Sequence, residues 1–183
     1  MDKETHDKVS LLSQAIADVI LITALSSPDY CNKTFLDGVL RNSGESDRNN
    51  IEYIIKECGL GNPAMLQMCL YALLLIPREL LGDDYCKIEV NEYVKNNIIC
   101  FNSTYPGEEQ NDGNYYRHIR NSVAHSNCEY EQVDCRTRVI FKDVDTKNGY
   151  HCELTMEFSK VGELLDILLL GIKLYLNDKM NKN

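Results

Sequence analysis

The chain has 183 residues, of which 44% are hydrophobic and 26% charged, proportions that are ordinary for one globular domain with a real core. Its formal net charge of −9 argues against a broad nucleic-acid-binding surface. The N-terminus lacks the apolar run of a signal peptide, and the longest apolar stretch, 164–176, is too short and too charged to span a bilayer. We expect a single cytoplasmic domain over residues 1–183, with flexible ends at about 1–4 and 180–183 and no membrane partner.

Eight cysteines are scattered along the chain without a CxxC pair. In a cytoplasmic protein this pattern indicates reduced, mostly buried thiols rather than disulfides. Cys128, Cys135, His151 and Cys152 could be considered as zinc ligands, but a C-x6-C spacing does not fit the common structural zinc sites. The chain also has no phosphate-binding glycine loop and no HExxH motif, so we expect no metal and no other cofactor.

Helical periodicity dominates the first two thirds of the chain. The pattern predicts a helix over 5–26 that Pro28 ends, and a short helix over 35–41. A polar, Ser/Asn/Gly-rich loop is expected over 42–50, and a helix resumes over 51–58.

Asn62 and Pro63 form a helix start signal, an N-cap followed by proline at the first helical position. The helix that they open, 64–81, is apolar nearly all round and is expected to be central, with a kink or break at Pro77. A further helix, capped by Asp83 or Asp84, is expected to run to about Cys100, and residues 102–114 read as an irregular loop.

Near the C-terminus the period changes from helical to alternating, and Asn148-Gly149 is a strong two-residue turn signal. Closing the turn there predicts a β-hairpin in which Phe141 lies opposite Met156 and Val139 lies opposite Phe158, with these four side chains on the core face. A final, largely apolar helix is expected over 160–179, capped by Ser159 and suited to a central position or a dimer interface.

Between the loop and the hairpin lies a predicted helix, 115–125, that ends in the sequence R-N-S-V-A-H. At about 100° per residue, its polar groups share an arc of about 140°; they are Arg117, Arg120, Asn121 and His125. The opposite face is apolar and consists of Tyr115, Tyr116, Ile119 and Val123. The segment 115–142 carries a local charge of +2, so any contact with RNA is expected to be a narrow site around this motif.

A mostly helical chain with Arg-polar-x3-His at the end of its penultimate long helix, followed by a hairpin and an apolar helix, resembles the HEPN superfamily. Arg120 and His125 match the R-x4-6-H signature of that family, and Asn121 matches the polar residue that usually follows the arginine. The resemblance implies a mainly α fold: a HEPN-like helical bundle with a β-hairpin inserted before the C-terminal helix. In some toxin members a tyrosine two residues after the histidine is modified by an antitoxin; here that position is Asn127, so this mode of control is not implied.

Many HEPN proteins are metal-independent endoribonucleases of toxin–antitoxin or phage-defence systems. The resemblance therefore implies RNA as substrate, a homodimer, and an antitoxin or defence-system protein as a further partner. The chemistry of the three groups suits such a reaction. His125 can act as general acid or base, Arg120 can stabilise the charge that builds on the phosphorane, and Asn121 can position them.

Because one motif carries one histidine, two motifs related by a two-fold axis would supply both an acid and a base. Arg117 and His118 are weaker candidates for RNA contact, since a solvated helix flank explains them as well. Three readings remain open: a nuclease, a non-catalytic HEPN module that binds RNA or a partner protein, and a regulatory protein that merely uses this scaffold. In the last two, Arg120 and His125 would form a helix-end pair stabilised by the helix dipole.

Overall fold

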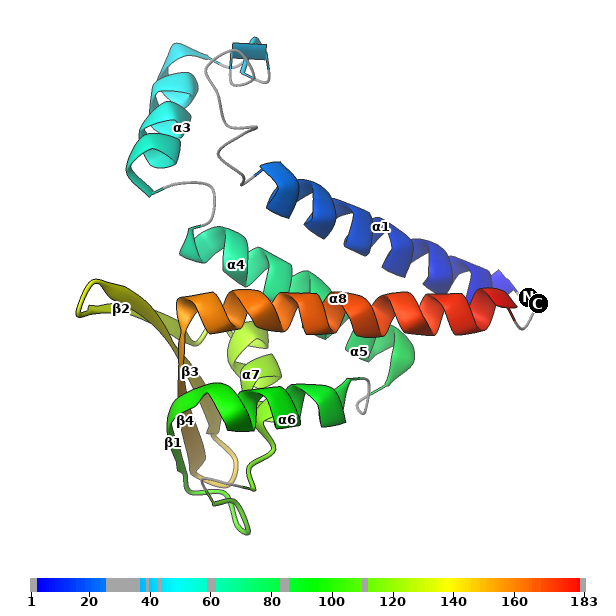
Figure 1. The fold of residues 1–183 in the computed structure, drawn as a ribbon, viewed down its shortest axis with the longest axis vertical. Helices are drawn as coiled ribbons and strands as arrows, with labels where there is room; N and C mark the ends of the chain where they lie inside the picture. The colour runs from blue at the N-terminus through cyan, green and yellow to red at the C-terminus, as the bar shows by residue number, and fades with distance from the viewer. Residues whose placement is uncertain are drawn as a thin grey trace.

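A computed structural model describes residues 3–25, 37–38, 40–42, 44–58, 62–82, 86–109 and 112–181 of the chain. The described part is mostly helical, as predicted, and contains a four-stranded antiparallel sheet of order β1-β4-β3-β2 (Figure 1). The elements in chain order are α1 (Lys3–Leu25), α3 (Glu45–Cys58), α4 (Pro63–Leu70), the π-helical turn η1 (Tyr71–Leu75), α5 (Ile76–Leu81), α6 (Lys87–Asn97), β1 (Ile98–Ser103), α7 (Tyr115–Ala124), β2 (Cys128–Val133), β3 (Arg136–Asp145), β4 (Tyr150–Glu157) and α8 (Phe158–Asn181). Residues 3–4 and 180–181 are helical, and the outermost residues of both expected flexible ends lie outside the described part.

The first helix lies where the periodicity predicts it, but the loop expected over 42–50 is helical from residue 45 onward. Helix α3 begins at Glu45 and includes the polar run that reads as a loop. Glu45 and Asp47 lie in its first turn, where carboxylates meet the positive end of the helix dipole and stabilise the helix start. Of the short helix predicted over 35–41, residues 37 and 38 are helical and 40 and 41 form a turn, while 35, 36 and 39 lie outside the described part. Figure 1 shows α3 set apart from the other helices.

The start signal at Asn62 is confirmed, whereas at Pro77 the helix changes its hydrogen-bond geometry and does not break. The Asn62 side chain accepts a hydrogen bond from the backbone N–H of Met65 at 3.1 Å. The π-helical turn η1 directly precedes α5, in which Pro77 is at the beginning. A proline cannot donate to the carbonyl four residues earlier, and the wider π-helical turn accommodates that loss without ending the helical path.

The segment Pro63–Leu81 is the one helix in the described part that is long and apolar enough to cross a membrane. Length and composition alone are weak evidence for that, because the core helix of a soluble protein passes the same test. Here Leu66, Leu70, Leu73 and Leu74 of this segment are buried in the protein core.

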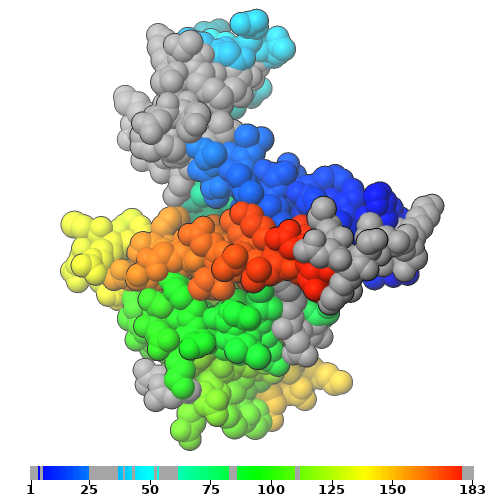
Figure 2. Space-filling view, turned by 45° about the vertical axis from the view of Figure 1, so that its right-hand side comes forward, coloured from blue at the N-terminus to red at the C-terminus, as the bar shows by residue number. Residues whose placement is uncertain are grey.

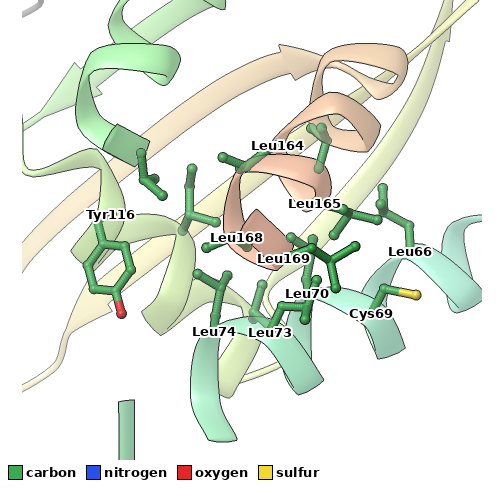
Figure 3. Packing of buried hydrophobic residues seen from close by; sticks show 14 of the residues in the cluster. Leu66, Cys69, Leu70, Leu73, Leu74, Tyr116, Leu164, Leu165, Leu168 and Leu169 are labelled. Atoms are coloured by element: carbon green, nitrogen blue, oxygen red, sulfur yellow. The ribbon is translucent and has the colours of Figure 1, made fainter. Parts of the chain in front are cut away.

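The main core lies between α8 and the α4–η1 segment. Figure 3 shows Leu164, Leu165, Leu168 and Leu169 of α8 facing the four buried leucines of α4 and η1. Burial of a leucine side chain contributes about 1.5–3 kcal/mol, so this seam stabilises the fold strongly. Figure 2 shows α8 as a ridge between α1 and the α6 region. The predicted cap of α8 is wrong: the helix begins at Phe158, which places Ser159 inside its first turn.

The two predicted strands of the hairpin pair as β3 and β4, but in a register shifted by two residues from the predicted one. Val139 pairs with Met156, and Phe141 pairs with Leu154. The turn is longer than two residues because the Asp145 carboxylate accepts hydrogen bonds from the backbone N–H groups of residues 147 and 148, at 3.0 and 3.1 Å. Since a shift of two preserves the side-chain alternation, the predicted core face of β3 remains buried.

The hairpin is not an isolated insertion, because it forms the centre of the sheet. Strand β2 pairs with β3, and β1 pairs with β4 from Ile98 to Ser103. The helix expected to run to Cys100 ends at Asn97, and the loop expected from residue 102 begins as a strand. Neither edge strand has a buried side chain, so neither shows a clear apolar alternation in the sequence. The pairing of β1 also depends on β4, a partner far along the chain.

The burial of the cysteines agrees only in part with the prediction that most of them are buried. The six whose side chains the structure describes are free thiols: Cys69 and Cys152 are buried, Cys86 and Cys128 are half-buried, and Cys100 and Cys135 are exposed. Burial raises the thiol pKa to about 11 at Cys128 and to about 12 at Cys152, so these two stay protonated and unreactive at neutral pH.

Candidate functional site

Helix α7 presents the predicted two faces. The Asn114 side chain caps its start by accepting from the backbone N–H of Arg117 at 3.4 Å. The predicted apolar face is buried in the core; it consists of Tyr115, Tyr116, Ile119 and Val123. Helix α7 packs against β3 and η1 and contacts α6, so its position depends on both the sheet and the central helix.

The polar motif at the end of α7 opens into a cleft of about 530 Å³. Arg120, Asn121, Ala124 and His125 line it from one side. The other walls come from α1, η1 and α5; they are formed by Leu11, Tyr71, Leu75, Ile76, Arg78, Glu79 and Leu80. The three predicted catalytic side chains therefore meet in one cleft.

The histidine of the motif stands just past the helix end. Helix α7 stops at Ala124, and the backbone N–H of His125 donates to the carbonyl of Asn121 at 3.0 Å. Its side chain is exposed. Ala124 also lines the cleft, and its small side chain leaves room for a ligand to approach the three polar groups.

Arg120 and Asn121 form a bonded pair. The guanidinium donates from Nε at 3.2 Å and from Nη2 at 2.8 Å to Oδ1 of Asn121. The amide Nδ2 of Asn121 in turn donates to both carboxylate oxygens of Asp143, each at 3.2 Å. Asp143 lies on β3, so the pair is connected to the sheet.

His118 lies neither on a solvated flank of the helix nor at an RNA-binding surface, so both predictions for it are wrong. It is 0% exposed, which excludes direct contact with RNA. Its Nδ1 lies 2.7 Å from Oδ2 of Asp143, and its Nε2 lies 2.7 Å from Oε2 of Glu108. Both ring nitrogens of His118 therefore lie within hydrogen-bond distance of a carboxylate oxygen.

Arg117, the other weaker candidate for RNA contact, does not line the cleft. Its Nη2 lies 3.2 Å from Oε1 of Glu108, and its guanidinium lies 4.3 Å from the centre of the Tyr105 ring. Ser103 donates to the other oxygen of Glu108 at 2.8 Å. These contacts hold Arg117 against the segment that joins β1 to α7, and they give it a structural role.

The carboxylate at the centre of this network remains ionised. Burial alone would raise the pKa of Asp143, but hydrogen bonds from His118 and Asn121 outweigh it and hold the pKa below its usual value. The nearby hydroxyl of Tyr105 behaves in the opposite way: burial, together with the charge of Asp143, raises its pKa to about 12. Tyr105 therefore remains a hydrogen-bond donor at neutral pH.

Three residues near the motif escape the sequence analysis: Asp143, Glu108 and Arg78. Asp143 does leave a signal, since it follows Val139 and Phe141 in the alternation of β3 and so falls on the core face, where a carboxylate needs a partner. Glu108 lies in a segment without periodicity, and Arg78 reaches the cleft only because α5 packs beside α1.

A family model described as HEPN pEK499 p136 matches residues 3–181 of the chain. No curated protein and no solved structure matches the chain significantly. The family match spans all the described elements, including the helix that ends in the R-N-x3-H motif. The chain belongs to the HEPN superfamily.

Proposed function

We propose that this protein is a metal-independent endoribonuclease whose active site contains Arg120, Asn121 and His125. The observation that carries the proposal is the convergence of these three side chains in one cleft. Its volume of about 530 Å³ lies within the range of about 300–1,000 Å³ that is usual for ligand sites. Membership of the HEPN superfamily, many members of which are nucleases, supports the same reading and suggests a role as a toxin or in phage defence.

The reaction is a transesterification within the RNA. The 2′-hydroxyl attacks the adjacent phosphorus while its proton passes to an imidazole acting as general base. The bond from phosphorus to the 5′-oxygen breaks, and that oxygen takes a proton from a general acid. His125 suits either role because an imidazole gives and takes protons near neutral pH. Arg120 stabilises the negative charge on the phosphorane through charge-assisted hydrogen bonds.

The proposal includes a homodimer. The R-N-x3-H motif carries one histidine, whereas the reaction uses both an acid and a base, so the motifs of two protomers would supply both. Exposed apolar side chains on α1 and on the α4–η1 segment support a partner on this face. Leu11 and Tyr71 line the cleft, and Leu21 and Met68 line an adjoining apolar groove. Ile76 borders both, so the two surfaces are continuous.

The nuclease activity is tested with purified protein, several RNA substrates and EDTA in excess. The wild type is expected to cleave RNA, and His125→Ala is expected to lower the rate by about 10²–10⁴-fold, the usual contribution of a general acid or base. His151→Ala is the matched control, since His151 is exposed on β4 away from the cleft, and it should keep the wild-type rate. Equal persistence of RNA with wild type and His125→Ala would reject catalysis.

The dimer is tested by light scattering. The wild type is expected to have twice the mass of the chain, and Met68→Glu should shift the protein toward the monomer, because it places a charge in the apolar groove. Ile88→Glu is the control, because Ile88 is an apolar, exposed side chain on α6 that lies outside the cleft and groove. A monomeric wild type at micromolar concentration would contradict the composite site.

The second candidate is a non-catalytic HEPN module that binds RNA or a partner protein. The excess of acidic residues and the presence of Glu79 in the cleft favour it, since both reduce affinity for a polyanion. It predicts that His125→Ala leaves dimerisation and any RNA binding unchanged while no cleavage occurs in either form.

A further inference from the structure

We propose that Asp143 and His118 are positioning residues that orient the cleft side chains Arg120 and Asn121. The role of this orientation in catalysis rests on the proposed nuclease function. The orientation itself rests on the hydrogen-bond chain that runs from the cleft through Asn121 to the sheet. Neither Asp143 nor His118 lines the cleft, so both act through other residues.

The first step of the chain concerns the amide of Asn121. Its Oδ1 accepts from two nitrogens of Arg120, and its Nδ2 donates to the carboxylate of Asp143. Only this orientation of the amide pairs a donor with an acceptor on both sides. A rotated amide would direct its NH2 group at the guanidinium and its oxygen at the carboxylate. Asp143 therefore selects the orientation that lets Asn121 hold Arg120.

The second step concerns Asp143 itself. It is 4% exposed, and its Oδ2 lies 2.7 Å from Nδ1 of His118. His118 is held from its other side by Glu108, at 2.7 Å from Nε2. A carboxylate between two donors in the interior has little freedom to rotate, because leaving either donor unpaired costs free energy. The contacts therefore transmit the rigidity of β3 and of the segment before α7 to the cleft.

The hydrogen-bond chain predicts a specific outcome when the amide of residue 121 and the carboxylate of residue 143 are exchanged. In Asp143→Asn, the new amide oxygen serves His118, and its NH2 group faces the NH2 group of Asn121. Rotating Asn121 relieves that clash but turns a donor toward Arg120. In the double variant Asn121→Asp/Asp143→Asn, the new carboxylate accepts from Arg120 and from the new amide, whose oxygen still serves His118. The contacts between Arg120, residue 121, residue 143 and His118 each pair a donor with an acceptor again.

The experiment follows the Nε–H group of Arg120 by ¹⁵N NMR and, in parallel, the rate of RNA cleavage. In the wild type, this N–H is expected to exchange slowly with solvent, because it donates to Asn121. In Asp143→Asn we expect fast exchange and a fall in kcat of about 100-fold, the effect of a misplacement of about 1 Å. The double variant should restore slow exchange and recover at least about tenfold in kcat.

Asp134→Asn is the matched control. It makes the same chemical change in the exposed turn between β2 and β3, at a φ of 49° that asparagine adopts readily. It should leave both readouts at the wild-type level.

Three results would overturn the positioning role: fast exchange in the wild type, wild-type exchange in Asp143→Asn, or no recovery in the double variant. The wild-type measurement needs no variant to fold. The wild type could cleave no RNA while the Nε–H of Arg120 exchanges slowly in the wild type and the double variant and fast in Asp143→Asn. In that case the nuclease proposal fails and the positioning of Arg120 stands.

Discussion

Arg120→Lys is expected to lower the rate of RNA cleavage by about 10²–10³-fold, the usual loss when one stabilising donor is removed from a reacting oxyanion. A guanidinium has five N–H donors, so it can be held by Asn121 through Nε and Nη2 and still meet a phosphate. A lysine keeps the charge but presents a single ammonium on a flexible stem. It cannot make both sets of contacts in one geometry.

The measurement is the single-turnover rate in EDTA, with thermal unfolding as a check that Arg120→Lys is folded. Arg136→Lys serves as the control, because Arg136 is exposed on β3 and pairs with Glu157 away from the cleft. It should cleave at the wild-type rate. Should Arg120→Lys cleave within about twofold of the wild type while His125→Ala is inactive, a positive charge alone would suffice, and the fork geometry of Arg120 would have no catalytic role.

His118→Ala is expected to be the most destabilising single change near the site, with a loss of about 3–5 kcal/mol in the free energy of unfolding at neutral pH. The substitution removes the partner that lies 2.7 Å from each of two carboxylates, Asp143 and Glu108. Asp143 is 4% exposed, so bulk water does not solvate its carboxylate in place of the lost donor. A buried charge without its partner accounts for most of the expected loss.

The loss should depend on pH, because Asp143 titrates differently in the two proteins. In the wild type, the folded-state pKa of Asp143 is lowered, so its stabilising contribution is present above the usual pKa of 3.8 and is lost as the pH falls through the folded value. Without His118, two contributions that lower this pKa are lost while burial remains, so the pKa rises and the ionised carboxylate stabilises the fold less. The difference between the proteins should therefore shrink from about pH 7 to about pH 3.

Urea unfolding at several pH values measures this difference. His6→Ala is the control, because His6 is exposed on α1, and it should change the free energy of unfolding by less than about 0.5 kcal/mol. A loss for His118→Ala below about 1 kcal/mol, or one of equal size at all pH values, would mean that the buried contacts contribute little.

The helical part of the fold follows from short-range rules. The Asn62 cap and the two faces of α7 can both be predicted, because each depends on residues within two turns of one another. The sheet could be predicted only in part. The alternation of β3 and β4 indicates two strands and their core face, whereas the register depends on the hydrogen bonds of Asp145 in the turn. Strand β1 depends on pairing with β4, about fifty residues away.

The candidate site divides in the same way. The sequence by itself determined that Arg120, Asn121 and His125 share one side of a helix end, because the helical period sets that spacing. Only the tertiary structure decided that His118, on the same helix, is buried between two carboxylates. Those carboxylates come from the segment before α7 and from β3, and no local rule relates them to the helix. The physical reason is that helical periodicity is a property of neighbours, whereas the partner of a buried charge is chosen by packing.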